Sequence, residues 1–420
     1  MSSTALFRTD ADIAHRSVER SGPIFVDTSL GKISLQLSAD WPGLRLEWEE
    51  LQRIAPCSAA QTYDWAHAYA RHVLVPEGRH AVIARGHAAD GALLFLWPFE
   101  VGTTGGIRVL SWLGHAHANY NMGMFAPAAK GLSADDLRAL LTAIGRETGA
   151  AAAILTAQPD SWDGVPNPFA RLPHQPSPNS GYVVKLGDFE TLFNSRFSKR
   201  SRSTLRRKER KLLETVPVSY GWAKTSKERI ELLDTFFAQK ARQFAAMGVK
   251  DVFDAHARAF YREVALLDED NPSRLRLGYI KTGDVTAAAF NGTIFKGRAA
   301  VSLSSLVDDA ELQRYSPGTL LLQHQIKEAC ENGLALFDMG AGEARHKIEW
   351  CEITEPLFDS FIALTIHGHV LTAPLALAAR AKRTIKTNPY LWPLVQRLRR
   401  NLLSRARSKA SERGDAAEEA

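Results

Sequence analysis

Residues 274–308 read RLRLGYIKTGDVTAAAFNGTIFKGRAAVSLSSLVD. Two turn signals, Thr282-Gly283-Asp284 and Lys296-Gly297, divide this β-prone stretch into three runs. Runs of this kind, separated by short Gly-containing turns, are typical of neighbouring antiparallel strands. The stretch therefore predicts a three-strand meander.

The next segment, residues 314–333, reads RYSPGTLLLQHQIKEACENG and predicts a helix. Ser316 suits the N-cap, Pro317 suits the first turn, and Gly333 lies just beyond the expected end. Residues 334–338 (LALFD) then predict a short buried strand, which opens into the loop MGAGEARHK.

Elements before the meander extend this unit towards the N-terminus. We expect a strand over residues 182–186, a basic helix over 198–214, and two more helices over 230–244 and 257–267. The first half of the chain has a similar order of helices, hairpin-rich strands, helix and strand. A duplicated α+β unit, within the α/β class, is therefore the predicted fold.

A Pro-, Asn- and Ser-rich stretch, residues 159–181, marks the boundary between the halves. The first residues lack sustained periodicity and indicate a tail or an early edge strand. The predicted domains are an N-terminal tail (1–37), a first half (38–180), a second half (181–372) and a basic C-terminal helix with its tail (373–420).

The net charge of +6, from 52 Lys and Arg against 46 Asp and Glu, is unevenly distributed. Residues 196–211 hold nine basic residues and one acid, and residues 380–420 hold eleven basic residues and four acids. The rest of the chain is a mildly acidic body with a net charge of −9. A hydrophobic fraction of 45% excludes wholesale disorder.

Several functional classes are excluded by the absence of their motifs. The three cysteines are far apart and lack CxxC spacing, which excludes a disulfide framework and a cysteine-rich zinc site. Walker A, GxSxG and HExxH motifs are absent, which argues against P-loop NTPases, α/β-hydrolases and zincins. We expect no metal, because the His-x-His pairs lack a convincing third ligand: His115 with His117, and His367 with His369.

The start of the helix predicted after residue 315 has the features of a phosphate site. A helix N-terminus leaves backbone N–H groups unpaired and carries the positive end of the helix dipole. Gly318 lets another group approach the backbone, and Arg314 lies just before the helix. These features fit a phosphate or pyrophosphate cradle, with an ordinary capped helix as the alternative.

Four segments together resemble the GNAT-type N-acyltransferases, and within them the branch named for CelD-type proteins of cellulose biosynthesis. They are WLGHAHANYN (112–121), FSKRSRSTLRRKERKL (197–212), YSPGTLL (315–321) and FDMGAGEARHKIEW (337–350). The resemblance implies two GNAT-like halves, each a mixed, mostly antiparallel sheet flanked by helices. It also implies that the acyl donor is an acyl-CoA, namely acetyl-CoA.

The same resemblance implies a donor site in the second half. It places the CoA pyrophosphate beside Arg314 at four backbone amides, those of Ser316, Gly318, Thr319 and Leu320. The chain departs from the family in two ways: the loop has a single glycine, and His346 stands before Lys347 where that branch usually has tyrosine.

Acyl transfer needs a base for the acceptor proton and a donor for the thioester oxyanion. The candidate bases are Asp338, Glu343 and His346, in or beside the glycine-containing loop. Lys347 is a candidate for binding substrate or cofactor phosphate, and Tyr315 for protonating the leaving thiolate. Capping, ion pairing, solvation or packing is the alternative role for each.

The basic helix, which presents Arg202 and Arg206, is a candidate surface for a polyanionic acceptor, with a solvated face as the alternative. Nucleic acid is disfavoured, because neither interleaved aromatics nor a DNA-reading pattern accompanies it. Asn119 and Tyr120 are further candidates for the acceptor groove, with loop hydrogen bonding as the alternative.

Residues 389–409 (PYLWPLVQRLRRNLLSRARSK) combine apolar residues at helical spacing with arginines and Trp392. Such a helix can lie on an anionic membrane, or it can pack on the body. The polar N-terminus and the lack of a long apolar run predict a cytoplasmic protein. Peripheral membrane contact is predicted for the case in which the basic C-terminal helix lies on the membrane.

The predicted function is therefore acyl-CoA-dependent N- or O-acyl transfer, with acetyl as the acyl group. The predicted acceptor is a small molecule or a glycan, such as a polysaccharide or cell-envelope precursor. Two rivals stay open: a FemABX-like transferase that uses aminoacyl-tRNA, and a non-catalytic scaffold that binds polyanions at a membrane.

Overall fold

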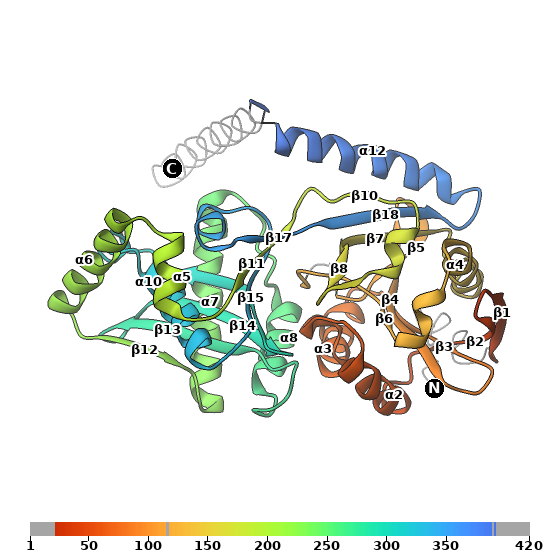
Figure 1. Cartoon of the computed structure of the whole chain (residues 1–420), viewed down its shortest axis with the longest axis horizontal. Helices are drawn as coiled ribbons and strands as arrows, with labels where there is room; N and C mark the ends of the chain where they lie inside the picture. Colours follow the sequence, from red (N-terminus) through yellow and green to blue (C-terminus); the bar gives the residue numbers. More distant parts are fainter. Residues whose placement is uncertain (1–21, 115–116, 389, 392–420) are drawn as a thin grey trace, which may run out of the picture.

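Two β-sheets form the framework of the molecule, each with helices packed on it (Figure 1). The computed structural model describes residues 22–114, 117–388 and 390–391. The first sheet has the spatial order β1 (Ile24–Thr28), β2 (Gly31–Ser38), β3 (His80–His87), β4 (Leu93–Thr104), β5 (Ile107–Trp112), β7 (Ala152–Pro159), β18 (Leu357–Ala363) and β10 (Gln175–Pro176), with β6 (Met124–Phe125) beside β4.

The second sheet has the order β12 (Val218–Trp222), β13 (Arg276–Thr282), β14 (Val285–Phe295), β15 (Arg298–Leu306), β16 (Leu336–Ala341), β11 (Gly181–Lys185) and β17 (Ile353–Glu355). A separate hairpin consists of β8 (Ser161–Trp162) and β9 (Val165–Pro166).

The helical elements of the first half are α2 (Trp41–Ile54), η1 (Ala59–Gln61), α3 (Tyr63–Tyr69), η2 (Ala70–Leu74), η3 (Pro127–Gly131), α4 (Ala134–Thr148) and η4 (Pro168–Arg171). Those that follow are α5 (Phe189–Arg196), α6 (Lys199–Thr215), α7 (Ser226–Met247), α8 (Ala255–Leu266), α9 (Ala310–Gln313), α10 (Pro317–Glu331), α11 (Arg345–Trp350) and α12 (Gly368–Thr387).

The predicted meander is confirmed as the antiparallel strands β13, β14 and β15. Its turns need left-handed backbone, which Gly283 (φ 58°) and Gly297 (φ 74°) supply without steric cost. The helix and strand predicted after the meander are α10 and β16, and the predicted basic helix is α6.

The two halves repeat one arrangement, so the predicted fold class is confirmed. Each sheet is mostly antiparallel and contains one parallel pair, β5 with β7 in the first and β15 with β16 in the second. In both cases a helix, α4 or α10, connects the two parallel strands, as a crossover between parallel strands requires.

The halves exchange strands at their boundary. The chain leaves the first sheet after β10 and enters the second sheet at β11, where the boundary between residues 180 and 181 was predicted. It then returns: β17 pairs with β11, whereas β18 pairs with β7 of the first sheet. Residues 357–363, predicted to belong to the second half, therefore complete the first, because a buried strand pattern does not specify which sheet it joins.

A shared core joins the halves on one face of the second sheet. Neighbouring residues of a strand point to opposite faces, so Phe290 packs in the core under α10 whereas Ala289 packs in the core under α7. The core under α7 continues into the first half, where Trp65 of α3 meets Phe260 of α8 edge-on at 4.9 Å.

The ends of the chain differ from the predicted boundaries. Residues 1–37 were predicted as a tail or an early edge strand, and the part from residue 24 onwards forms the paired strands β1 and β2, with β1 at the edge of the sheet and Ile33 and Leu35 of β2 in the first core. The C-terminal helix begins at Gly368 rather than near residue 373. Residues 1–21, His115 and the basic segment 392–420 lie outside the described residues.

Because of the strand exchange, removing a side chain of β18 should weaken the whole molecule. Phe358 is 1% exposed in the first core, so Phe358→Ala should cost about 3–5 kcal/mol of unfolding free energy. Urea unfolding followed by fluorescence and circular dichroism should give one transition, shifted to lower urea. Leu46→Ala, at a side chain 76% exposed, should change the stability by less than about 0.5 kcal/mol. Two separate transitions, of which only one moves, would contradict this account.

Candidate active site

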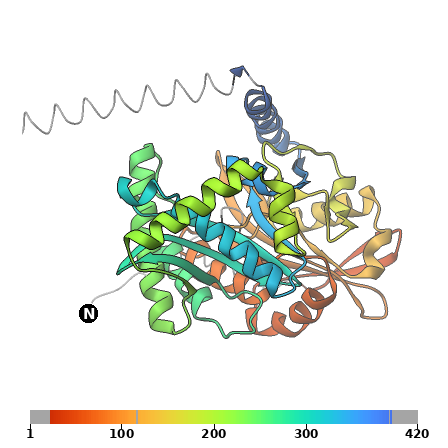
Figure 2. The same ribbon diagram turned by 60° about the vertical axis from the view of Figure 1, so that its left-hand side comes forward.

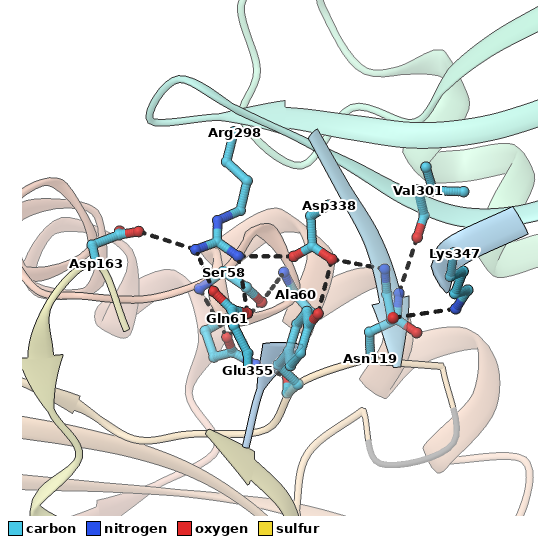
Figure 3. A network of polar contacts seen from close by, with 12 residues as sticks. Ser58, Ala60, Gln61, Asn119, Asp163, Arg298, Val301, Asp338, Lys347 and Glu355 are labelled. Carbon is cyan, nitrogen blue, oxygen red and sulfur yellow. Dashed lines mark hydrogen bonds and ion pairs between the residues drawn. The ribbon is translucent and has the colours of Figure 1, made fainter. Parts of the chain in front are cut away.

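A buried carboxylate lies where the two halves meet. Asp338 of β16 is 0% exposed. Its Oδ2 accepts a hydrogen bond from Arg298 Nη1 at 2.9 Å (Figure 3). Its Oδ1 accepts from the Tyr120 hydroxyl at 2.8 Å and from the Gly340 amide at 2.7 Å. Burial, and then the charge of Asp338, raises the pKa of Tyr120, so the first half contributes a hydroxyl that stays a donor.

Arg298, at the start of β15, joins this carboxylate to two more. Its guanidinium donates to Glu355 at 3.0 and 3.2 Å and to Asp163 at 3.3 Å, and lies 3.9 Å from the centre of the Trp162 ring. Burial opposes the Arg298 charge, but the hydrogen bonds and charges of Glu355 and Asp338 outweigh it and raise the pKa of Arg298. The arginine therefore stays charged and links the β8–β9 hairpin to β15, β16 and β17.

These contacts favour a structural role for Asp338 over the predicted role of general base. Both carboxylate oxygens already accept hydrogen bonds, and the group pairs with the buried cation of Arg298. Removing the charge of this carboxylate would leave a buried cation with one partner fewer, and this is costly inside a protein. Asp338 instead fixes the end of β16 against the first half.

A pocket opens beside this network, between the halves. It is lined from the first half by Asn119, Tyr120 and Trp162, and from the second by Arg298 and Ser302. The predicted acceptor residues Asn119 and Tyr120 are therefore both at the boundary between the halves. The Tyr120 hydroxyl donates its proton to Asp338. Asn119 Nδ2 carries two protons and donates one of them to the Val301 carbonyl, so its second proton is left for a ligand.

Asn119 fills a gap between two strands of the second sheet. The parallel pairing of β15 with β16 ends at Ala300 and Asp338, although both strands continue. Beyond that point, Asn119 Nδ2 donates to the Val301 carbonyl at 3.0 Å (Figure 3). A Cβ at Gly340 would lie 2.6 Å from the same nitrogen, so glycine is needed for Asn119 to enter the gap.

Lys347 of α11 contacts the backbone of the same glycine. Its Nζ donates to the carbonyls of Gly340 and Ala341 at 3.2 and 3.0 Å. Burial lowers the pKa of Lys347 to about 8, against the opposing charge of Asp338. In a fraction of the molecules the Lys347 amine is therefore neutral near physiological pH, and the neutral amine can accept a proton.

Glu343 and His346, the other predicted bases, do not join this cluster. Both lie at exposed positions, and Glu343 lines a separate cleft beside the end of α12. Partial burial, and then the charge of Lys347, lowers the pKa of His346. The helical turn of α11 turns neighbouring side chains in different directions, so Lys347 points to the gap and His346 does not.

The start of α10 is bordered by the basic helix α6 (Figure 2). Ser316 has a left-handed backbone (φ 60°), and its hydroxyl does not cap the helix. It instead accepts a hydrogen bond from Lys208 Nζ at 2.7 Å. A cation and the positive end of α10 therefore meet at one place, which favours an anion.

The predicted amide cradle is narrower than expected. The amides of Thr319 and Leu320 donate to the Ser316 carbonyl at 2.9 and 3.2 Å, and the Ser316 amide donates to Gln313. Within the described part of the chain, only the Gly318 amide of the predicted four has no partner. A Cβ at Gly318 would lie 2.7 Å from Leu306 Cδ2, so this glycine also serves the packing of α10 against β15.

The other predicted residues have contacts elsewhere. Arg314 pairs with Glu311 and donates to the Tyr315 hydroxyl. Hydrogen bonds from Thr215 and then from Arg314 lower the pKa of Tyr315, but none of them leads towards the gap. Arg202 binds the carbonyls of Asn194 and Phe197, and Arg206 lies 3.6 Å from Glu190.

Sequence reasoning missed Arg298 and Lys208 as individual residues. Arg298 follows a turn and begins a buried strand, which is an unusual place for an arginine and could have pointed to a paired cation. No signal singles out Lys208 among the cations of α6, because its neighbours carry the same charge. Within the described residues, no group of three or more His, Cys, Asp or Glu is placed to hold a metal ion.

Asp338→Asn distinguishes a structural anion from a base. We expect a loss of about 3–5 kcal/mol in the free energy of unfolding, because Arg298 would lose a buried partner. Urea unfolding is the measurement, with Glu311→Gln as the control. Glu311 pairs with Arg314 at the surface, where the two side chains are 77% and 57% exposed, so the control should cost less than about 1 kcal/mol. An Asp338→Asn variant of unchanged stability but without activity would restore the role of base.

Comparisons with known proteins agree with this geometry. Residues 199–348 match the family model of the acetyltransferase (GNAT) domain. The chain resembles the crystal structure of FemX at 11% identity, with a TM-score of 0.52 over 79% of this chain and 98% of that one. It also resembles a conserved protein of unknown function from Bacteroides thetaiotaomicron (12% identity, TM-score 0.49, 81% and 99% covered). No curated protein matches.

The matched region runs from α6 to α11. It contains the meander, α10, Lys347 and the two strands, β15 and β16, that border the gap. The likeness to FemX extends over both halves and shows the shared fold. The second half of the chain thus contains a GNAT acetyltransferase domain, over residues 199–348.

Proposed function

We propose that this protein transfers an acyl group, acetyl, from acyl-CoA to an amine or hydroxyl of a polysaccharide or cell-envelope precursor. The observation that carries the proposal is the contact between Lys208 and Ser316 at the N-terminus of α10. The start of α10 lies next to the last part of β15, which continues after its pairing with β16 has ended at Ala300. This chemistry also agrees with membership of the CelD-type branch that the sequence resembles.

The donor phosphates would lie at the start of α10. The Gly318 amide is free to donate, Lys208 supplies a positive charge, and α6 has further exposed cations that pair with no acid within the described residues, namely Lys199, Arg200, Arg207 and Lys211. A pyrophosphate with a further phosphate carries several negative charges, so it suits such a surface.

The thioester would lie where β15 and β16 cease to pair. Val301 and Gly340 border this place, and Asn119 reaches it from the first half. The acceptor would enter from the pocket between the halves. Ser302 supplies a hydroxyl there, and Trp162 and Ala118 line the pocket with apolar atoms, which is the mixture of polar and apolar groups that small-molecule sites use.

The reaction can be written for these residues. The acceptor nitrogen or oxygen attacks the thioester carbonyl carbon, the C–S bond breaks, and CoA leaves as the thiolate. The neutral Lys347 amine takes the acceptor proton, which then passes to the thiolate. The second amide proton of Asn119 points to the developing oxyanion, a type of contact that stabilises such transition states. Tyr315 has no part in this scheme.

An aminoacyl-tRNA donor is the rival that one observation favours. The exposed cations of α6 suit a polyanion larger than CoA. Thermal stabilisation by aminoacyl-tRNA without stabilisation by acetyl-CoA would decide for it. A scaffold without catalysis would bind neither donor.

The Lys208 contact predicts a local effect on donor affinity. In calorimetry with acetyl-CoA, Lys208→Gln should weaken binding about tenfold, because a charge-assisted hydrogen bond contributes about 1.5–3 kcal/mol. Lys227→Gln removes the same charge from α7, where the side chain is 85% exposed, and should change the affinity less than about twofold. Equal effects of the two substitutions would refute a site at Ser316.

The Lys347 assignment predicts a pH profile. A base must be neutral, so kcat/KM should rise with pH through about 8 and then level off. Lys347→Arg keeps a positive charge at this position, and the arginine stays protonated throughout the pH range. The rate should therefore fall about 100-fold, and the rise of kcat/KM with pH should disappear. Lys327→Arg, at an exposed pair on α10, should keep the wild-type profile. A Lys347→Arg enzyme with an unchanged profile would exclude Lys347 as the base.

A further inference from the structure

One face of α12 is apolar, and no other part of the described chain covers it. Its large side chains, with Ile366 from the turn before the helix, are exposed as follows: Ile366 86%, Val370 73%, Leu377 67% and Ile385 38%. Spacings of four, seven and eight residues place them on one side of a helix. Exposed small residues, Ala373 and Ala381, fill the same line. Soluble proteins seldom leave a continuous apolar stripe in water without a partner for it.

The opposite face fixes α12 to the body. Gly368 and Thr372 are buried, and a Cβ at Gly368 would lie 2.0 Å from the Ala151 carbonyl oxygen. Gln175 Nε2 donates to the Ala376 carbonyl at 3.0 Å. The helix therefore runs along the rim of the molecule over β18 and β10 (Figure 1), with the apolar stripe directed outwards.

The charge around the stripe has one sign. α12 contains Arg380, Lys382, Arg383 and Lys386 and no acidic residue, and the sequence has no Asp or Glu from 360 to 411. None of these four cations pairs with an acid within the described residues; Lys386 contacts the Asn179 amide oxygen instead. The second half of α12 is thus an uncompensated positive surface beside an apolar one.

We propose that α12 docks on an anionic lipid surface and lies in its plane. The apolar stripe would enter the boundary between headgroups and acyl chains, and the cations that flank it, Arg380 and Lys382, would meet lipid phosphates. A second copy of the chain is a poorer occupant, because it would bring these flanking cations close to those of the first copy. Arg383 and Lys386 lie on the side of α12 that borders the cleft lined by Glu343, so they face away from the lipid.

The test is co-sedimentation of the full chain with phosphatidylcholine vesicles, with and without phosphatidylglycerol. Val370→Ser with Leu377→Ser should lower binding to anionic vesicles at least about tenfold, since both side chains would enter the interface. Arg380→Gln with Lys382→Gln should also lower it about tenfold at low salt, and little at high salt. Leu46→Ser with Val75→Ser is the matched control, because these side chains are 76% and 64% exposed elsewhere.

Binding that depends on anionic lipid, is lost in the α12 variants and is kept in the control supports the proposal. Wild-type binding by the Val370→Ser, Leu377→Ser variant would overturn it and assign any lipid contact to another part of the chain. A dimer in sedimentation velocity that this variant dissociates, without vesicle binding, would overturn it as well and identify a self-association face. Donor binding is measured separately, so this proposal and the acyltransferase proposal can fail independently.

Discussion

The buried guanidinium of Arg298 is the contact on which the arrangement of the two halves depends. It binds carboxylates of the second half, Asp338 and Glu355, and reaches Asp163 and Trp162 of the first. A buried charge is tolerated only when it is paired and hydrogen-bonded. The position of one half relative to the other, and hence the shape of the pocket between them, is therefore set by electrostatics as much as by the shared apolar core.

The strand β18, which crosses into the first sheet, holds the two halves together around this contact. β18 follows the strands of the second sheet in the chain but completes the first sheet beside β7, so the halves cannot separate without breaking that pairing. A rigid boundary of this kind suits a site built from two parts. Neighbouring residues of β15 point to opposite faces, which leaves Ser302 in the pocket while Val301 packs in the core under α10. Donor and acceptor can thus approach one strand from two sides.

The sequence predicts the elements well and their partners poorly. The meander, α10 and β16 follow from turn residues, a capped helix start and a short apolar run, which are all local signals. The exchange of β18 is not local, and neither is the entry of Asn119 into the gap beside Val301, because both depend on segments far apart in the chain. The pairing of Asp338, the predicted base, with Arg298 is not local either, because Arg298 lies on another strand. Lys347 was identified, but its role depends on burial, which the sequence does not display.

The central claim is that the donor lies along α6, the start of α10 and the gap between β15 and β16. Hydrogen–deuterium exchange of the full chain, with and without acetyl-CoA, tests it most directly. The account predicts slower exchange of the amides in residues 301–306 and 316–320 and in α6, with no change in the outer strands β1 and β2. Protection elsewhere, or none at saturating acetyl-CoA, would contradict it.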